Sequence, residues 1–315
     1  MVTVGFVVTP GFPVMSLAAL SVFEFANIEA DGPIYGITVL SEHGGAVPTT
    51  MGTTVNTVPF GQEHFDTLIV GGNTRVTPTS PALCAFVVEA AKVSRRMSSI
   101  CTGVFVLGDA DLLEGRRVTT HWAFTEELKV RFPSARLEEN RIFVVDGPIW
   151  TAAGNSAGLD LTLWMLENDY GSELARTVAR TLVVDRQRSG GQSQHSALLE
   201  MNPKTDRIQD ALSYARLNLK TALSVEELAG VARLGPRQFS RALRAETGMS
   251  PAKAVESLRL EAARLMIQTS RHTVDVIAAE TGFGDQERMR RAFIRVHGQP
   301  PQLIRRMSQP AATSR

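Results

Sequence analysis

The sequence predicts two domains of different class: an α/β domain with a doubly wound parallel sheet, then an all-α domain with two helix-turn-helix motifs. Over residues 1–185, short apolar segments alternate with amphipathic ones, as strands and helices do in such sheets. Between residues 223 and 301 a helix-turn-helix pattern occurs twice.

The net charge changes sign along the chain. Residues 1–205 hold 15 Lys and Arg against 21 Asp and Glu, a net −6, whereas residues 206–315 hold 18 against 11, a net +7. A basic segment after an acidic one fits a nucleic-acid-binding domain attached to a globular one.

In the N-terminal domain each expected strand is a short apolar run, and each expected helix repeats apolar residues at spacings of three and four. The expected strands are Thr3–Thr9, Gly36–Ser41, Phe65–Val70, Met97–Ile100 and Val118–Thr120, with a hairpin over Arg141–Ala152 that turns at Asp146 and Gly147. The expected helices are Val14–Ala26, Pro81–Ser94, Thr102–Leu113, Trp122–Phe132, Asn155–Asn168 and Ser172–Val184.

Three strand ends carry groups that suggest chemistry. Cys101 lies between an apolar strand and a helix, so we expect its thiol on a sharp bend, with helix N-terminal amides lowering its pKa. His121 ends the next expected strand, which a parallel sheet would bring to the same edge. The two glycines of the Gly71–Asn73 turn could offer backbone N–H groups to an oxyanion. The alternative is that Cys101 is a small buried hydrophobe and that His121 is a hydrogen-bonding residue at a strand end.

One unit occurs twice in the C-terminal part, over Leu223–Pro251 and over His272–Pro301. Each copy has apolar residues at i, i+3 and i+4 for a short first helix, a glycine near the turn, and an apolar i, i+4 pair for a second helix. A long helix, Ala252–Gln268, is expected between the copies. The residues Val225, Leu228, Ala229, Leu234 and Gly235 recur 49 positions later, and Phe239, Leu243, Gly248 and Pro251 recur 50 positions later.

The remaining face of each second helix is rich in arginine and amide side chains. Arginine can pair with guanine and amides with adenine in the major groove, and further arginines neutralise phosphates. The alternative is a solvated charged face on an ordinary helical bundle, which two matching copies disfavour. We expect DNA contacts from Arg237, Gln238, Ser240, Arg241 and Arg244, and from Gln286, Glu287, Arg288, Arg290, Arg291 and Arg295, with Arg244 and Arg295 on phosphates.

Residues 207–302 resemble the paired helix-turn-helix domain of AraC/XylS-type bacterial transcription regulators, most closely in GFGDQ and MRRAFIRVHGQPP of the second copy. The resemblance implies two recognition helices joined by one long helix and about one turn of DNA apart. Asp285 and Glu287 place acid at the start of the second recognition helix. We therefore expect that copy to bind cytosine or to contact DNA less than the first.

Residues 1–185 resemble the PfpI-type branch of the glutamine-amidotransferase-like superfamily in the segments PGF, ICTG, ADLLEGRRVTTHW and TAAGNSAGLDLTLWML. Together the two parts resemble GlxA-like transcription regulators over nearly the whole chain. The resemblance implies a flavodoxin-like, class I glutamine-amidotransferase-like sheet. It also implies that this domain senses a small effector, such as an amino acid or a quaternary amine, and forms a homodimer.

The site departs from the enzymes of that superfamily, which commonly have His after the elbow cysteine and an acid on the first helix. Here Thr102 and Ser16 occupy those positions, and a Cys/His pair without an orienting acid transfers acyl groups poorly. We therefore expect a degenerate, non-catalytic site. The expected effector contacts are Cys101, Thr102, His121, Gly71, Gly72, Asn73 and Ser16. The alternatives are a PfpI-like cysteine-dependent enzyme, of hydrolase, hydratase or glyoxalase type, and a redox sensor that uses Cys101.

Two cysteines, Cys84 and Cys101, give no disulfide framework, and we find neither a basic-then-apolar leader nor an apolar run of about 18 residues. We expect a cytoplasmic protein with no cofactor, no metal and no membrane partner. Its expected partners are promoter DNA, a small effector, a second copy and, for an activator, RNA polymerase. The expected domains are 1–185 and 207–306, with a linker at 186–206 and a disordered tail at 307–315.

Overall fold

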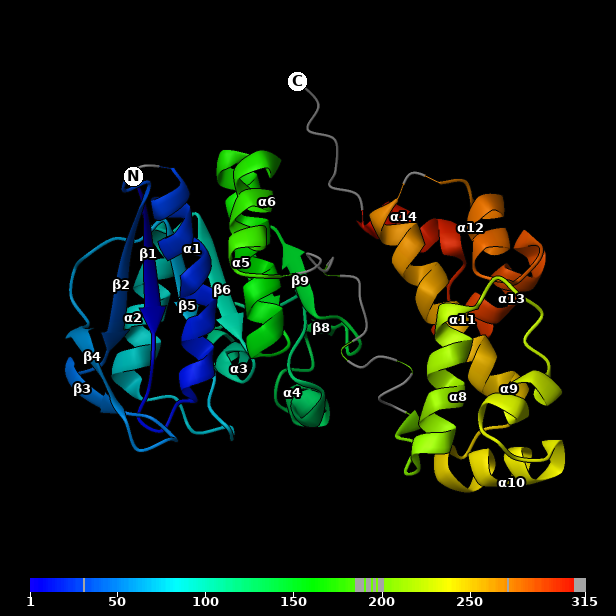
Figure 1. Cartoon of the computed structure of the whole chain (residues 1–315). Helices are drawn as coiled ribbons and strands as arrows, with labels where there is room; N and C mark the ends of the chain where they lie inside the picture. Colours follow the sequence, from blue (N-terminus) through cyan, green and yellow to red (C-terminus); the bar gives the residue numbers. More distant parts are fainter. Residues whose placement is uncertain are drawn as a thin grey trace. The chain divides into compact units, whose positions relative to one another are not determined.

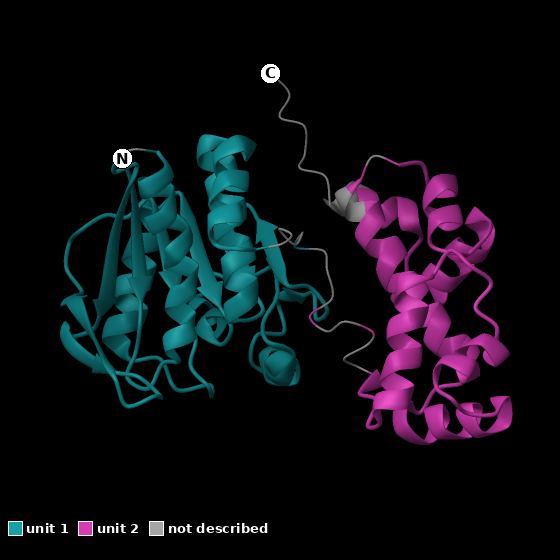
Figure 2. Ribbon diagram, in the orientation of Figure 1, with its two compact units in different colours: residues 1–190 teal, residues 191–315 magenta. Residues whose placement is uncertain are grey.

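In the computed structural model the chain forms two compact units, Met1–Gly190 and Gly191–Arg315 (Figures 1 and 2). The structure describes residues 1–30, 32–184, 190, 194, 197, 201–270 and 272–308. Within these ranges, no helix is both long enough and apolar enough to span a membrane.

The first unit is built on a mainly parallel sheet. Its described strands follow the order β3-β4-β2-β1-β5-β6-β10-β9, with β3 and β9 antiparallel to their neighbours at the two edges. This is the predicted doubly wound sheet. The strands are β1 Val2–Val7, β2 Tyr35–Ser41, β3 Gly45–Pro48, β4 Thr54–Pro59, β5 Thr67–Val70, β6 Arg96–Ile100, β9 Phe143–Asp146 and β10 Ile149–Ala152.

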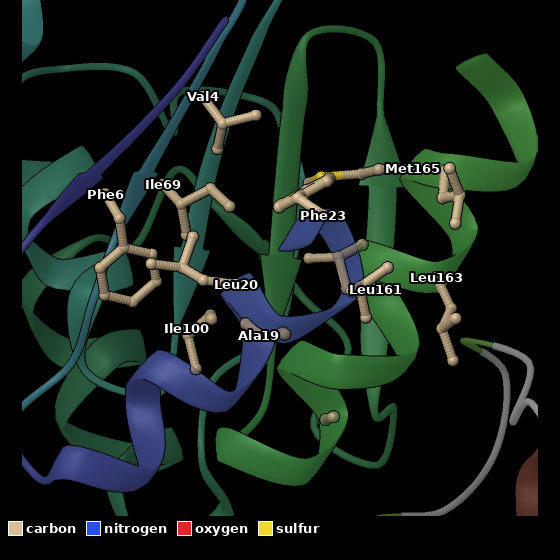
Figure 3. Packing of buried hydrophobic residues seen from close by; sticks show 14 of the residues in the cluster. Val4, Phe6, Ala19, Leu20, Phe23, Ile69, Ile100, Leu161, Leu163 and Met165 are labelled. Carbon is tan, nitrogen blue, oxygen red and sulfur yellow. The ribbon is translucent and has the colours of Figure 1, made fainter. Parts of the chain in front are cut away.

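Helices pack on both faces of this sheet because successive strand residues point to opposite sides. Val4 and Phe6 pack with α1 (Ala18–Glu29) and α5 (Asn155–Tyr170), as Figure 3 shows. Val7 packs on the other side. The helix α6 (Ser172–Thr181) belongs to the first layer, and α2 (Pro81–Val93) and α3 (Gly103–Asp109) to the second.

Two expectations about the strands need correction. The strand predicted over 118–120 is β7 (Arg117–Val118), which pairs with β8 (Arg136–Leu137) in a separate two-stranded sheet instead of joining the main one. The β3–β4 hairpin was not predicted, because most of its side chains are exposed and it lacks a buried apolar run. The predicted hairpin over 141–152 is confirmed as β9–β10.

The helix predicted over 102–113 is also shorter than expected, ending at Asp109. The chain leaves the helix at Asp111, whose φ of 57° is left-handed. The helix predicted over 122–132 begins as the short 3-10 helix η2 (Trp122–Phe124) and continues as α4 (Thr125–Arg131). A second 3-10 turn, η1 (Val14–Leu17), precedes α1.

The second unit is helical and has two cores, one for each copy of the repeat. Phe239 and Leu243 are buried in the first, and Met289 and Phe293 in the second, as predicted. The long α11 contributes to both. The described helices are α8 Asp206–Leu217, α9 Val225–Val231, α10 Pro236–Thr247, α11 Pro251–Thr269, α12 Val274–Glu280, α13 Gln286–His297 and α14 Pro301–Ser308.

The predicted linker and tail are only partly described. Within 186–206, which composition predicts to be an exposed linker, Ala197 and Met201 are instead buried in the first helical core. The α14 helix continues through Ser308, beyond the predicted end of the domain. The rest of the predicted tail, 309–315, lies outside the described residues.

Candidate functional site

The two helix-turn-helix copies reach the same turn with different residues. Gly282 has a left-handed φ of 76°, and a Cβ on it would collide with the carbonyl oxygen of Leu219. Arg233, 49 positions earlier, takes the same conformation with φ of 55°. The one-residue change of offset falls before the second helix: the N-cap residues Gly235 of α10 and Asp285 of α13 are 50 positions apart, so Gly284 is the extra residue. Asp285 Oδ1 accepts the Arg288 N–H at 2.7 Å.

The outward face of α10 carries a row of arginines. Arg237, Arg241 and Arg244 lie at i, i+4 and i+7 and are exposed, roughly opposite the buried Phe239 and Leu243. None of the three forms an ion pair with any residue that the structure describes. Of the other predicted contacts on this helix, Gln238 is exposed and Ser240 is half-buried.

The equivalent row of α13, 50 positions later, is Glu287, Arg291 and Ile294. Glu287 accepts two hydrogen bonds from Arg290, from Nε at 2.8 Å and from Nη2 at 2.9 Å. The Arg290 hydrogen bond holds the pKa of the Glu287 carboxyl below its usual range.

Among the other predicted contacts of α13, Gln286, Arg288 and Arg291 are exposed. Arg295, predicted to bind a phosphate, forms an ion pair with Glu256 of α11, with Nη2 and Oε1 2.6 Å apart. The two recognition helices, α10 and α13, therefore present different charges on faces of the same geometry.

In the first unit, Cys101 lies on the predicted sharp bend. Its φ is 58°, and its N–H donates to the Ala152 carbonyl at 2.9 Å. The strand ends approach each other closely here: a Cβ on Gly72 would lie 2.6 Å from the Thr102 nitrogen. The Thr102 hydroxyl accepts the Asn73 N–H at 2.7 Å and donates to the Asn73 carbonyl at 3.0 Å, joining the two turns.

Ser16 and His121 both lie beside the start of α5. The Ser16 hydroxyl donates to Asn155 Oδ1 at 3.1 Å, and a Cβ on Gly154 would lie 3.6 Å from His121 Cδ2. His121 is also linked to the bend, because the hydroxyl of the preceding Thr120 donates to the Cys101 carbonyl at 3.1 Å. His121 therefore lies near the Cys101 bend because of α5 and Thr120, and not as the end of a main-sheet strand. Cys101, Thr102, Ser16, His121 and the Gly71–Asn73 turn are called the Cys101 site below.

The structure contradicts one predicted chemical property of the Cys101 site and part of another. Burial raises the pKa of the Cys101 thiol, and this outweighs the lowering effect of the backbone hydrogen bond from Thr102. Of the two glycines predicted to offer an N–H to an oxyanion, Gly71 donates its N–H to the Val7 carbonyl at 2.9 Å and does not fit that role. The Asn73 N–H of the same turn is bound by Thr102, and the role of the Gly72 N–H stays a prediction. Met15 and Trp122, which are next to Ser16 and His121 in the sequence, were not among the predicted site residues; both side chains are about half exposed.

One buried polar atom beside the Cys101 bend lacks a hydrogen-bond partner among the described residues. Asn73 Nδ2 donates to the Thr9 hydroxyl at 2.8 Å, but its Oδ1 is buried without a hydrogen-bond partner among the residues described. In the same set of residues, no group of three or more His, Cys, Asp or Glu side chains is arranged to hold a metal ion.

Comparison with known proteins identifies both units. The DJ-1/PfpI family matches residues 28–168, and a helix-turn-helix domain family matches residues 228–307. An HTH-type transcriptional regulator of Mycobacterium tuberculosis is 31% identical over 262 residues, which cover 79% of this chain and 98% of that protein. The chain belongs to the HTH-type transcriptional regulators that carry a DJ-1/PfpI domain.

Two further relatives extend this likeness. The HTH-type transcriptional regulator GlxA of Rhizobium meliloti is 28% identical over 311 residues, covering 97% of this regulator and 96% of that protein. The crystal structure of an AraC family transcriptional regulator from Pseudomonas putida shares the fold of the first unit, with a TM-score of 0.54 and 24% identity. It aligns over 58% of this chain and 100% of that one.

Proposed function

We propose that the protein regulates transcription by binding promoter DNA through α10 and α13, and that its first unit senses a small molecule at the Cys101 bend. The observation that carries the first part is the pair of exposed helices in the same register, each held by its own core. The helix α11 between them has 19 residues, about 28 Å at 1.5 Å per residue. This length suits two recognition helices about one turn of DNA apart.

Arg241 provides the test of DNA binding. A selection from a randomised duplex library should enrich one sequence, and Arg241→Ala should weaken binding to that sequence by about 1–3 kcal/mol if the residue contacts a base. Arg216 of α8 is exposed and lies outside both recognition helices, so Arg216→Ala is the matched control for loss of one positive charge. Equal gel-shift midpoints for Arg241→Ala and the wild type would remove Arg241 from the interface.

The Cys101 site supports sensing better than catalysis. Thr102 is committed to Asn73, and Ser16, where the related enzymes have an acid, bonds to Asn155. A thiol with a raised pKa is a weak nucleophile near neutral pH, because the thiolate is the reactive form. Ligand contacts are proposed for Cys101, His121 and the Gly71–Asn73 turn, with Asn73 Oδ1 able to accept a hydrogen bond from an amine or amide donor.

We also propose two protein partners and a cellular location. The first unit would form a homodimer, and RNA polymerase would be a further partner if the protein activates transcription. Both roles require the cytoplasm, where bacterial DNA lies.

A further inference from the structure

The repeat allows the outward faces of α10 and α13 to be compared position by position. At 50-residue spacing, Arg237 is matched by Glu287 and Arg244 by Ile294, while Arg241 is matched by another arginine, Arg291. At these three positions α10 therefore has a charge of +3, whereas α13 has no net charge and includes an apolar side chain. Outside this row, α13 also carries the exposed Arg288. Arginines without ion-pair partners suit phosphates, and their contribution does not depend on sequence.

Glu287, which stands where α10 has the first arginine of the row, forms an ion pair with Arg290. Its carboxylate lies one residue into α13 and is bound at both oxygens by Arg290. The side chain nevertheless remains 55% exposed. A carboxylate has about four acceptor sites, so the two hydrogen bonds from Arg290 leave capacity for another donor. An exposed carboxylate repels phosphates but can accept a hydrogen bond from the amino group of cytosine in the major groove.

We propose that the two recognition helices divide the work of binding DNA: Arg237 and Arg244, at the two ends of the α10 row, bind phosphates, and Glu287 of α13 selects a C·G base pair. This inference rests on the DNA-binding function proposed above. Arg290 is a positioning residue in this scheme, because it orients the carboxylate. Ile294, one helical turn beyond Arg291 and 40% exposed, would add an apolar contact suited to a thymine methyl.

The test compares two neutral substitutions at equivalent positions in the full-length protein, Arg237→Gln and Glu287→Gln. Dissociation constants are measured at several salt concentrations for two probes: the duplex enriched from a randomised library by the wild type, and a 30-bp duplex of unrelated sequence. Each C·G pair of the enriched duplex is then changed in turn. Thermal melting of each variant checks that it folds, as expected for exposed positions.

Arg237→Gln should weaken binding to both duplexes by a similar factor and make the slope of log K against log salt about 0.9 less steep, as loss of one phosphate contact does. Glu287→Gln should bind the unrelated duplex more tightly, since a negative charge near the phosphates is removed. When one particular C·G pair of the enriched duplex is replaced, the affinity of the wild type should fall at least about fivefold. The affinity of Glu287→Gln should fall less than about twofold for the same replacement.

Two results overturn the division of labour. One is an enriched sequence in which Glu287→Gln keeps the wild-type preference at every C·G pair. The other is a change in affinity for Glu287→Gln that is equal for both duplexes and in the direction of weaker binding. A wild-type protein that enriches no sequence at all would instead contradict the proposed DNA-binding function itself.

Discussion

Cys101 combines a strained backbone with a partly buried side chain. A non-glycine residue in the left-handed region costs about 1–2 kcal/mol, and here the surrounding hydrogen bonds to Ala152 and Thr120 hold it there. The bend could be predicted from an apolar strand that runs directly into a helix. The direction of the pKa shift could not, because the burial that raises it comes from segments distant in sequence.

The raised pKa gives a testable pH dependence. In a Cys84→Ser background, the rate of Cys101 alkylation by iodoacetamide should rise with a midpoint above about 8.5, the ordinary thiol value. The same shift makes the folded state lose stability as the pH rises through the alkaline range, because the unfolded chain releases the thiol proton first. The urea-unfolded protein is the control and should show the ordinary midpoint. A midpoint near or below 7 in the folded protein would instead support the redox-sensor alternative.

At the scale of elements, the repeat allowed the second unit to be predicted better than the first. Apolar pairs such as Phe239 and Leu243 belong to a local helical pattern, which sequence spacing reveals directly. In the first unit, β7 was assigned to the main sheet because a strand-like run does not specify its partner. The β3–β4 hairpin escaped prediction because an exposed edge needs few apolar residues.

Asp285 is an acidic residue expected near DNA, and the structure shows that its side chain caps the helix α13. We therefore expect Asp285 to contribute to the stability of the second unit. Asp285→Ala should destabilise the second unit by about 1 kcal/mol, whereas Asp285→Asn should stay within a few tenths, because asparagine caps equally well. Urea unfolding followed by circular dichroism at 222 nm measures both. Equal losses in the two variants would mean that the charge of Asp285, and not its capping hydrogen bond, stabilises α13.

The whole molecule joins two units, and each unit has its own hydrophobic cores. The first unit lies in the acidic part of the chain and the second mainly in the basic part. All three tryptophans, Trp122, Trp150 and Trp164, belong to the first unit. Because Trp122 lies next to His121 and is half exposed, tryptophan fluorescence should report a ligand bound at the Cys101 site. Domain assignment followed from composition and periodicity, but the buried Ala197 and Met201 could not be predicted from a segment rich in Gly, Ser and Gln.

A thermal-shift screen against amino acids, methylated amines and aldehydes should identify a compound that raises the melting temperature without being consumed. A ligand at one hundred times its dissociation constant stabilises the folded state by about 2.7 kcal/mol. Cys101→Ala is the control for chemistry. A compound that the wild type consumes and this variant does not would establish the enzyme alternative.

If the protein is a sensor, binding of the compound and binding of DNA must affect each other to the same extent, because the two equilibria are thermodynamically linked. If the compound changes the affinity for the enriched duplex by some factor, typically about 5–150-fold, saturating duplex must change the affinity for the compound by the same factor. The first constant comes from gel shifts with and without compound, and the second from tryptophan fluorescence titrations with and without duplex, with Trp122→Phe to identify the reporter. Unequal factors would show that the two measurements do not describe one coupled equilibrium. If both factors equal one, the first unit binds the compound without changing the affinity of α10 and α13 for DNA. The sensing role would then be excluded for that compound.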